Sequence, residues 1–141
     1  MPAPRPHPQS THPLGRLGSR AHRERGEATQ FAVLAGTAIL AIFTIVQAWL
    51  YYAAGNTARS AAQAGLQATR VQHGSARAGQ QAALQNAAAV GGITNLQVTA
   101  NRGPAHATVT VTGTAPSVIP LLTLPPIRAE ASGAVERTTT P

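Results

Sequence analysis

Residues 31–52, FAVLAGTAILAIFTIVQAWLYY, form the longest uninterrupted apolar stretch of the chain, and no charged side chain occurs between Glu27 and Arg59. At about 1.5 Å of rise per residue, a helix of this length covers the roughly 30 Å hydrocarbon core of a bilayer. A helix tolerates occasional polar side chains there because its backbone groups are paired internally. The stretch has three such interruptions, Thr37, Thr44 and Gln47. It therefore predicts one membrane-spanning helix over residues 28–54.

The charges on either side of the stretch differ. Arg59 is the only basic residue in the window after it, whereas four arginines lie within about 15 residues before it. These four are Arg16, Arg20, Arg23 and Arg25. Basic residues mark the cytoplasmic side of a span, and aromatic rings such as Trp49 and Tyr52 gather at the membrane interface. The pattern predicts a single-pass protein of the plasma membrane, with a cytoplasmic N-terminus and an extracytoplasmic C-terminal domain.

Two other interpretations of the stretch fit less well. A cleaved secretory signal has an apolar region of about 7–15 residues that ends at a small-x-small site. This stretch is longer, it ends in bulky Tyr51 and Tyr52, and the nearest such site, residues 62–64, lies well beyond it. A buried helix of a soluble protein is disfavoured because the rest of the chain has too few large apolar residues to cover it.

Residues 1–27 are rich in Pro, Arg and His and contain little that could be buried, which predicts a disordered cytoplasmic tail. The chain carries a formal net charge of +7, and the arginines of this tail could contact nucleic acid or anionic lipid. No aromatic residues alternate with these arginines to stack on bases, so we expect lipid rather than nucleic acid as the partner. The histidines of the tail lack preformed metal-binding geometry.

Residue types and motifs argue against an enzyme. The chain has no Cys, Asp or Lys, and its only acids are Glu24, Glu27, Glu130 and Glu136. No phosphate-binding loop, nucleophile elbow or zinc-protease motif occurs. We therefore expect no catalytic residue, cofactor, metal site or small-molecule substrate.

Residues 55–92 are rich in Ala and Gln and predict extracytoplasmic helices. The membrane helix is expected to continue to about Val71, with a break at residues 73–75 and a second helix over 76–89 that ends at two glycines. Small residues form a stripe that would let another helix approach closely. We call Ala54, Ala58, Ala61, Gly65 and Ala68 the small-residue stripe. The alternative is an alanine-rich helix without a partner, in which this register arises by chance.

Residues 93–137 change to the period of strands. Segments 96–100 and 106–112 alternate apolar and polar residues around a turn at 101–104, which predicts a β-hairpin. The residues facing one side would be Ala107, Val109 and Val111. Residues 128–137 offer a third strand with Ala129, Ala131 and Val135 facing inward. Because a lone hairpin is marginal in water, we expect a small antiparallel sheet resting on the extended helix, followed by a tail at 138–141.

Residues 116–127, PSVIPLLTLPPI, are strongly apolar, but their prolines prevent a continuous helix or a central strand. Such a loop either closes over the sheet and the helix or stays exposed as a contact surface for a partner subunit or for lipid. In the second case the surface would comprise Val118, Ile119, Leu121, Leu122 and Leu124.

The junction before the apolar stretch, Arg25-Gly26-Glu27-Ala28-Thr29-Gln30-Phe31, resembles the start of type IV pilin-like precursors. With the Ala-rich segment that follows the span, residues 24–137 look most like the TadE-like family, pseudopilins of the tight-adherence (Flp) pilus assembly system. The resemblance implies a pilin-like α+β membrane protein, with one N-terminal transmembrane helix extended outward and then a small antiparallel β-sheet.

The resemblance also implies a processing site and partners. A prepilin peptidase would cut between Gly26 and Glu27, and Phe31 stands at the fifth position after the cut, where pilins usually have a glutamate. The implied function is that of a non-enzymatic minor pseudopilin that assists assembly or anchoring of a Flp-type pilus or a type II-like secretion system. Its partners would be lipid and other membrane or pilin-like helices. The alternative is a general membrane-anchored envelope protein that packs against other membrane helices without a pilus role.

Overall fold

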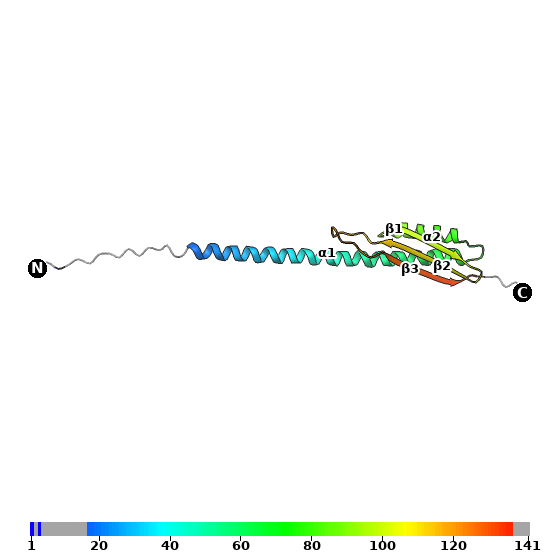
Figure 1. Cartoon of the computed structure of the whole chain (residues 1–141), viewed down its shortest axis with the longest axis horizontal. Coiled ribbons are helices and arrows are strands. Elements are labelled where there is room, and N and C mark those ends of the chain that lie inside the picture. The colour runs from blue at the N-terminus through cyan, green and yellow to red at the C-terminus, as the bar shows by residue number, and fades with distance from the viewer. Residues whose placement is uncertain (2, 4–16, 137–141) are drawn as a thin grey trace. The chain divides into compact units, whose positions relative to one another are not determined.

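The structure, a computed structural model, describes Met1, Ala3 and residues 17–136, and it describes side chains from residue 28 onward as well as those of Met1 and Ala3. The chain divides into two compact units, Met1–Ala41 and Ile42–Pro141. Figure 1 shows the order of the elements. They are α1 (Leu17–Arg70), α2 (Ala76–Val90), β1 (Thr94–Arg102), β2 (His106–Thr114) and β3 (Ile127–Ala134). The protein thus combines a long apolar N-terminal helix with a small antiparallel sheet, as expected for an α+β chain.

Helix α1 starts earlier than the sequence predicted. Residues 17–27, expected to belong to a disordered tail, are helical, whereas residues 2 and 4–16 of that tail lie outside the described residues, as does the predicted tail at 138–141. Pro13 is the last proline before Pro104, and the residues after it include the good helix formers Leu, Ala, Arg and Glu. Extending an existing helix by one residue costs far less than nucleating a new one, so the apolar helix propagates backward through them.

A tight turn separates the two helices close to the predicted position. α1 ends at Arg70, and His73 adopts a left-handed conformation (φ 64°) in the turn. Ser75 caps α2, because its hydroxyl oxygen accepts a hydrogen bond from the Ala78 amide at 3.1 Å. At the other end Gly91 (φ 74°) donates its amide to Ala87 O at 2.8 Å, so glycine supplies the conformation that ends the helix.

The sheet has the order β1-β2-β3, with both pairs antiparallel. Strand β2 alternates as predicted: Ala107, Val109 and Val111 are fully buried, and the threonines between them lie on the other face. Strand β3 ends at Ala134, so Val135 lies just past the strand and still packs partly against the core. The amide of Val135 continues the register of the β2–β3 pair by donating to Ala105 O at 2.9 Å, but its partner strand β2 begins only at His106, so the strand pairing stops at Ala134.

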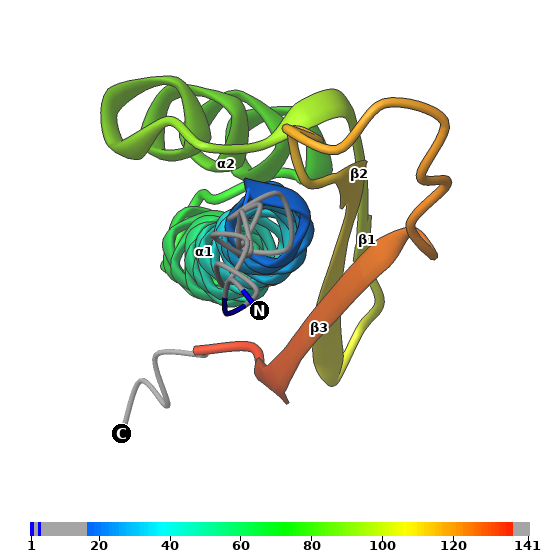
Figure 2. The ribbon, with the colours of Figure 1, turned by 90° about the vertical axis from the view of Figure 1, so that its left-hand side faces the viewer.

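Within residues 42–136 the two helices lie side by side and the sheet packs against them (Figure 2). The core between these layers is built mainly from alanine and valine, and its largest fully buried side chains are Val109, Val111 and Thr69. Such small side chains contribute little apolar area each, so the layers must approach closely for the core to be well packed.

Candidate membrane segment and interaction surfaces

The first candidate surface is the apolar part of α1. Among the described residues one helix is long and apolar enough to cross a membrane. An 18-residue segment of this helix has a mean hydropathy of 2.2, and only 6% of that segment is buried inside the protein. Large apolar side chains are exposed on all sides of this segment, as shown by Leu34, Leu40 and Ile42, which lie on different sides of the helix and are 68%, 63% and 60% exposed. Water is an unfavourable environment for a continuous surface of this kind.

Gln47 is the exception in this segment, because it is only 5% exposed. Its Nε2 donates a hydrogen bond to Pro116 O at 3.1 Å, and its Oε1 accepts one from the Val118 amide at 2.8 Å. The one side-chain amide of the apolar stretch is therefore hydrogen-bonded to the loop between β2 and β3. By contrast, the hydroxyl of Thr37 donates to the carbonyl of Val33 in its own helix, at 2.8 Å.

The loop between β2 and β3, residues 115–126, is called the apolar loop below. A groove of about 470 Å³ lies between this loop and α1. It is lined by Thr44, Gln47, Ala48 and Tyr51 of the helix and by Ile119, Leu122, Leu124 and Pro125 of the loop. The loop therefore lies beside the last turns of the apolar stretch of α1.

The predicted contact residues of the loop divide into two groups. Ile119 and Leu124 are half-buried, and Leu124 packs against the core. Val118 and Leu122 are 38% and 40% exposed, and Leu121 is fully exposed with a left-handed backbone (φ 64°). The two alternatives considered for the sequence thus apply to different residues of one loop: part of it closes over the helix and part faces outward.

The small-residue stripe of α1 is occupied within the chain. Ala54, Ala58 and Ala61 are fully buried in the core, Gly65 is buried and Ala68 is half-buried. A Cβ atom added to Gly65 would lie 2.8 Å from Gly79 O, 3.0 Å from Ala83 Cβ and 3.0 Å from Val109 Cγ1. The close partner of this stripe is therefore the chain's own α2, together with the buried face of the sheet.

Polar contacts along the same helix pair reinforce this arrangement. Thr57 donates its hydroxyl to Gly91 O at 2.8 Å, and the Ser60 hydroxyl donates to Asn86 Oδ1 at 2.9 Å. These bonds join α1 to the C-terminal half of α2, whereas the contact of Gly65 with Gly79 lies near the N-terminus of α2. The two helices are thus held together along the whole length of α2.

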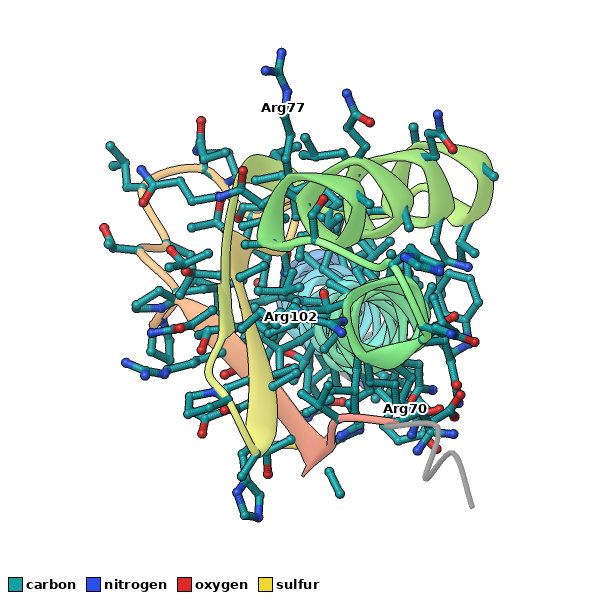
Figure 3. All side chains as sticks on the ribbon, turned by 90° about the vertical axis from the view of Figure 1, so that its right-hand side faces the viewer. Arg70, Arg77 and Arg102 are labelled. Atoms are coloured by element: carbon teal, nitrogen blue, oxygen red, sulfur yellow. The ribbon has the colours of Figure 1, made fainter. Side chains whose placement is uncertain are left out.

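Arginine side chains organise the C-terminal end of α1. Figure 3 shows Arg102, at the end of β1, directed toward this helix end, whereas Arg77 points outward from α2. The guanidinium of Arg102 donates to the carbonyl oxygens of Thr69 and, at 3.1 Å, of Val71. Helix ends leave their last carbonyls without intrahelical partners, so the sheet supplies the missing donors. Sequence reasoning missed this role, because no local pattern links Arg102 to residues more than 30 positions away.

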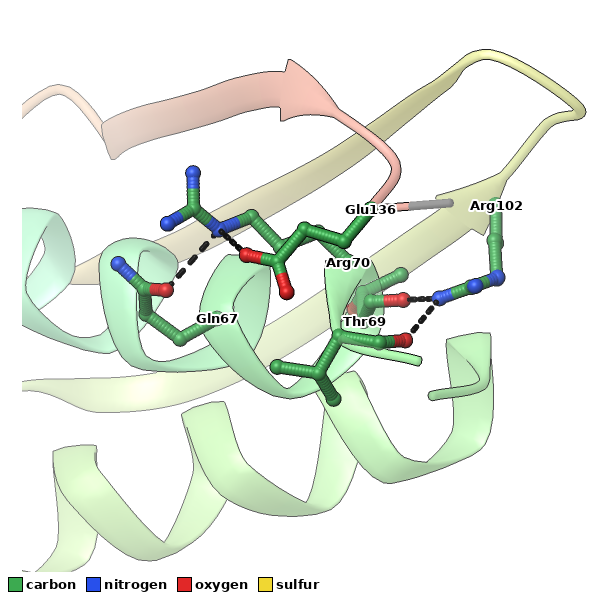
Figure 4. Close-up of polar contacts among 6 residues, drawn as sticks. Gln67, Thr69, Arg70, Arg102 and Glu136 are labelled. Atoms are coloured by element: carbon green, nitrogen blue, oxygen red, sulfur yellow. Dashed lines mark hydrogen bonds and ion pairs between the residues drawn. The ribbon is translucent and has the colours of Figure 1, made fainter. Parts of the chain in front are cut away.

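The segment after β3 closes the same helix end, as Figure 4 shows. The amide of Glu136 donates to Arg70 O at 3.0 Å. The Arg70 Nε atom donates to Gln67 Oε1 at 3.0 Å and lies 3.8 Å from Glu136 Oε1. Both ionic side chains are partly solvated, so the ion pair adds little, and the backbone hydrogen bond is the more important contact.

The predicted processing site lies in the N-terminal part of α1. Gly26 and Glu27 belong to the helical run of α1, but their side chains lie outside the described ones.

Among the described residues no group of three or more His, Cys, Asp or Glu could hold a metal ion. A second groove, of about 510 Å³, lies between α1 and β3, with Arg59, Arg128 and Glu130 in its lining. Arg128 pairs with Glu130 there at 3.5 Å.

Comparison of the chain with protein-family models, with curated proteins and with solved structures finds no match.

Proposed function

We propose that this chain is a non-enzymatic, single-pass protein of the plasma membrane that acts as a TadE-like minor pseudopilin. Residues 28–54 of α1 would span the bilayer, with the N-terminus in the cytoplasm and the α/β domain outside. The observation that carries the proposal is the exposure of large apolar side chains over residues 31–46 of a helix that continues into a small folded domain. Lipid, or another apolar helix, is the environment that such a surface requires.

The two parts of α1 differ in side-chain size, and this difference supports lateral packing against other helices as the mechanism of the protein. The small residues of α1 after residue 53 are buried in contacts with α2 and the sheet, so they are not free to contact another chain. The exposed residues of the apolar segment are mostly large, for example Phe31, Leu40 and Phe43. Contacts with other membrane or pilin-like helices would therefore use bulky side chains of the span, while the domain outside supplies a rigid head for recognition.

The test is the chemical state of the protein in its native membrane. We expect it to stay with the membrane after a high-salt wash, to be released by detergent, and to have Glu27 as its N-terminal residue. Replacing Gly26 by Leu should leave the full-length chain uncut, because a prepilin peptidase requires a small residue before the cut. The matched control Gly18→Leu introduces the same side chain in the same helix and should be processed normally.

A second candidate function is a general envelope anchor that packs against other membrane helices without a pilus role. It is favoured by Phe31, which stands at the position where pilins usually have a glutamate. A membrane-bound chain that keeps its original N-terminus would support this candidate and contradict the pseudopilin proposal. A chain recovered in the soluble fraction without detergent would contradict both.

A further inference from the structure

We infer that the apolar loop is a lipid-binding element that places Val118, Leu121 and Leu122 among acyl chains of the outer leaflet. This inference rests on the proposed membrane span of α1 and extends it, because it assigns a second part of the chain to the bilayer. The loop comes from the folded domain and is more than 60 residues away from the span in sequence.

The position of the loop along α1 is the first argument. Both hydrogen bonds of Gln47 and the groove from Thr44 to Tyr51 hold the loop beside about 10 Å of the apolar helix. On the same stretch of helix, Ile45 and Trp49 are 69% and 65% exposed. Because the loop touches the helix there, the medium that surrounds these two side chains also surrounds the outward side of the loop.

The backbone of the loop is suited to a medium without water. An unpaired amide in hydrocarbon is costly, and proline has no amide hydrogen to satisfy. Four residues of the loop, Pro116, Pro120, Pro125 and Pro126, are prolines. Of the remaining amides, that of Val118 donates to Gln47 and that of Leu122 donates to Ile119 O at 3.3 Å. Proline, which prevents regular structure here, also reduces the number of donors left unpaired.

The side chains of the loop point to the same environment. No charged residue occurs between residues 113 and 127. Leu121 is fully exposed and has a positive φ of 64°, a conformation that glycine or asparagine would adopt at lower cost. A large apolar side chain held outward on a strained backbone gains nothing in water, whereas contact with acyl chains would compensate for the strain.

Basic residues mark the polar boundary above this level. Arg59 lies about 10 Å beyond Tyr52 along the helix, and Arg128 follows directly on the first residue of β3. Both line the groove between α1 and β3. Arginine at the edge of a membrane extends its guanidinium toward lipid phosphates, so these two positions are suited to the headgroup layer.

The experiment uses the absence of cysteine in the chain. Leu121→Cys carries a nitroxide spin label in the full chain, reconstituted into phosphatidylcholine vesicles. Its collision rates are measured with oxygen, which concentrates in acyl chains, and with a water-soluble nickel complex. Ile45→Cys serves as the reference for the span, and Thr99→Cys, an exposed residue of β1, as the reference for water. We expect the Leu121 label to match Ile45, with high oxygen and low nickel accessibility. Leu122→Cys repeats the measurement where the backbone is not left-handed.

The other outcomes separate this inference from the membrane proposal. If the Ile45 label is in lipid while the labels at both loop positions behave like Thr99, the loop inference is overturned and the span stands. Labels at 121 and 122 that are shielded from both reagents would also overturn it, because protein from a second copy or a partner would then cover the loop. If the Ile45 label is accessible to nickel, the span itself fails and the loop inference fails with it.

Discussion

The close contact between α1 and α2 makes a strong prediction for Gly79→Ala. A Cβ atom at this position would lie 1.8 Å from Thr69 Oγ1 and 2.9 Å from Gly65 O. The carbonyl belongs to the backbone of α1 and cannot move alone. The hydroxyl of Thr69 is fully buried and donates to that same carbonyl at 2.7 Å, so turning it away breaks a buried hydrogen bond. The methyl group therefore displaces the Thr69 hydroxyl, which loses this hydrogen bond, and still forces the two helices apart at Gly65 O.

The expected cost follows from three contributions. Overpacking against backbone is at the upper end of the usual range, about 3 kcal/mol, and loss of the Thr69 hydrogen bond adds about 1 kcal/mol. The higher helix propensity of alanine offsets this loss by about 1 kcal/mol, so the free energy of unfolding should fall by about 3 kcal/mol in total. For a domain of this size that corresponds to a fall in melting temperature of roughly 10–20 °C.

Gly55→Ala is the matched control, because a Cβ atom there meets only Arg59 Nη1, at 3.9 Å. It should stabilise the chain by up to about 1 kcal/mol through helix propensity. The assay is thermal unfolding of the full chain in mild detergent, with amide exchange in β2 as the readout of the domain. Equal melting of the two variants would refute the close approach of α1 and α2. In a Thr69→Ala background the cost of Gly79→Ala should fall, because the nearest clashing atom is gone.

Three further predictions concern the loop and the helix end. Gln47→Leu removes both hydrogen bonds to the apolar loop, worth about 1–3 kcal/mol together, and should speed amide exchange at Val118 roughly 10- to 100-fold; unchanged exchange would contradict the pairing. Arg102→Ala should lower the unfolding free energy by about 1.5–3 kcal/mol, measured by denaturant titration, while Arg77→Ala changes it by less than about 0.5 kcal/mol. Leu121→Gly should melt at a higher temperature in detergent than Leu121→Ala, because both remove the apolar side chain and only glycine adopts the left-handed backbone freely; equal or lower melting would contradict the strain at this residue.

Local signals explain why the secondary structure could be predicted from the sequence. The start of α2 follows from Ser75, which caps it, and the end of α2 from Gly91, because these residues have strong capping or conformational preferences of their own, whereas the left-handed residue of the turn between the helices is His73 rather than the glycine beside it. The buried face of β2 follows from its strict alternation, since side chains on a strand point to opposite faces in turn. In each case the determining residues lie within a few positions of one another.

The contacts between distant segments could not be predicted. Gln47 looked like a tolerated polar interruption, but its partners are 69 and 71 residues away. Arg102 looked like an ordinary turn residue, yet it completes the end of α1. The early start of α1 was missed for a different reason: the charge and proline content of residues 1–27 suggested disorder, whereas helix propagation from the apolar segment decides the outcome for residues 17–27.

The distribution of side-chain size along α1 connects the fold with the proposed function. After residue 53 the buried side chains of the helix are chiefly alanines, which bring α2 and the sheet close but bury little apolar area each. Before residue 53 the helix carries the largest apolar side chains of the chain and leaves them exposed. A sequence that only had to stabilise its own domain would place large side chains in the core and small or polar ones outside. The reversed order is consistent with an apolar segment whose contacts lie outside this chain, in lipid or in neighbouring helices. The apolar loop lies where the exposed apolar part of α1 gives way to the part that is buried in the domain.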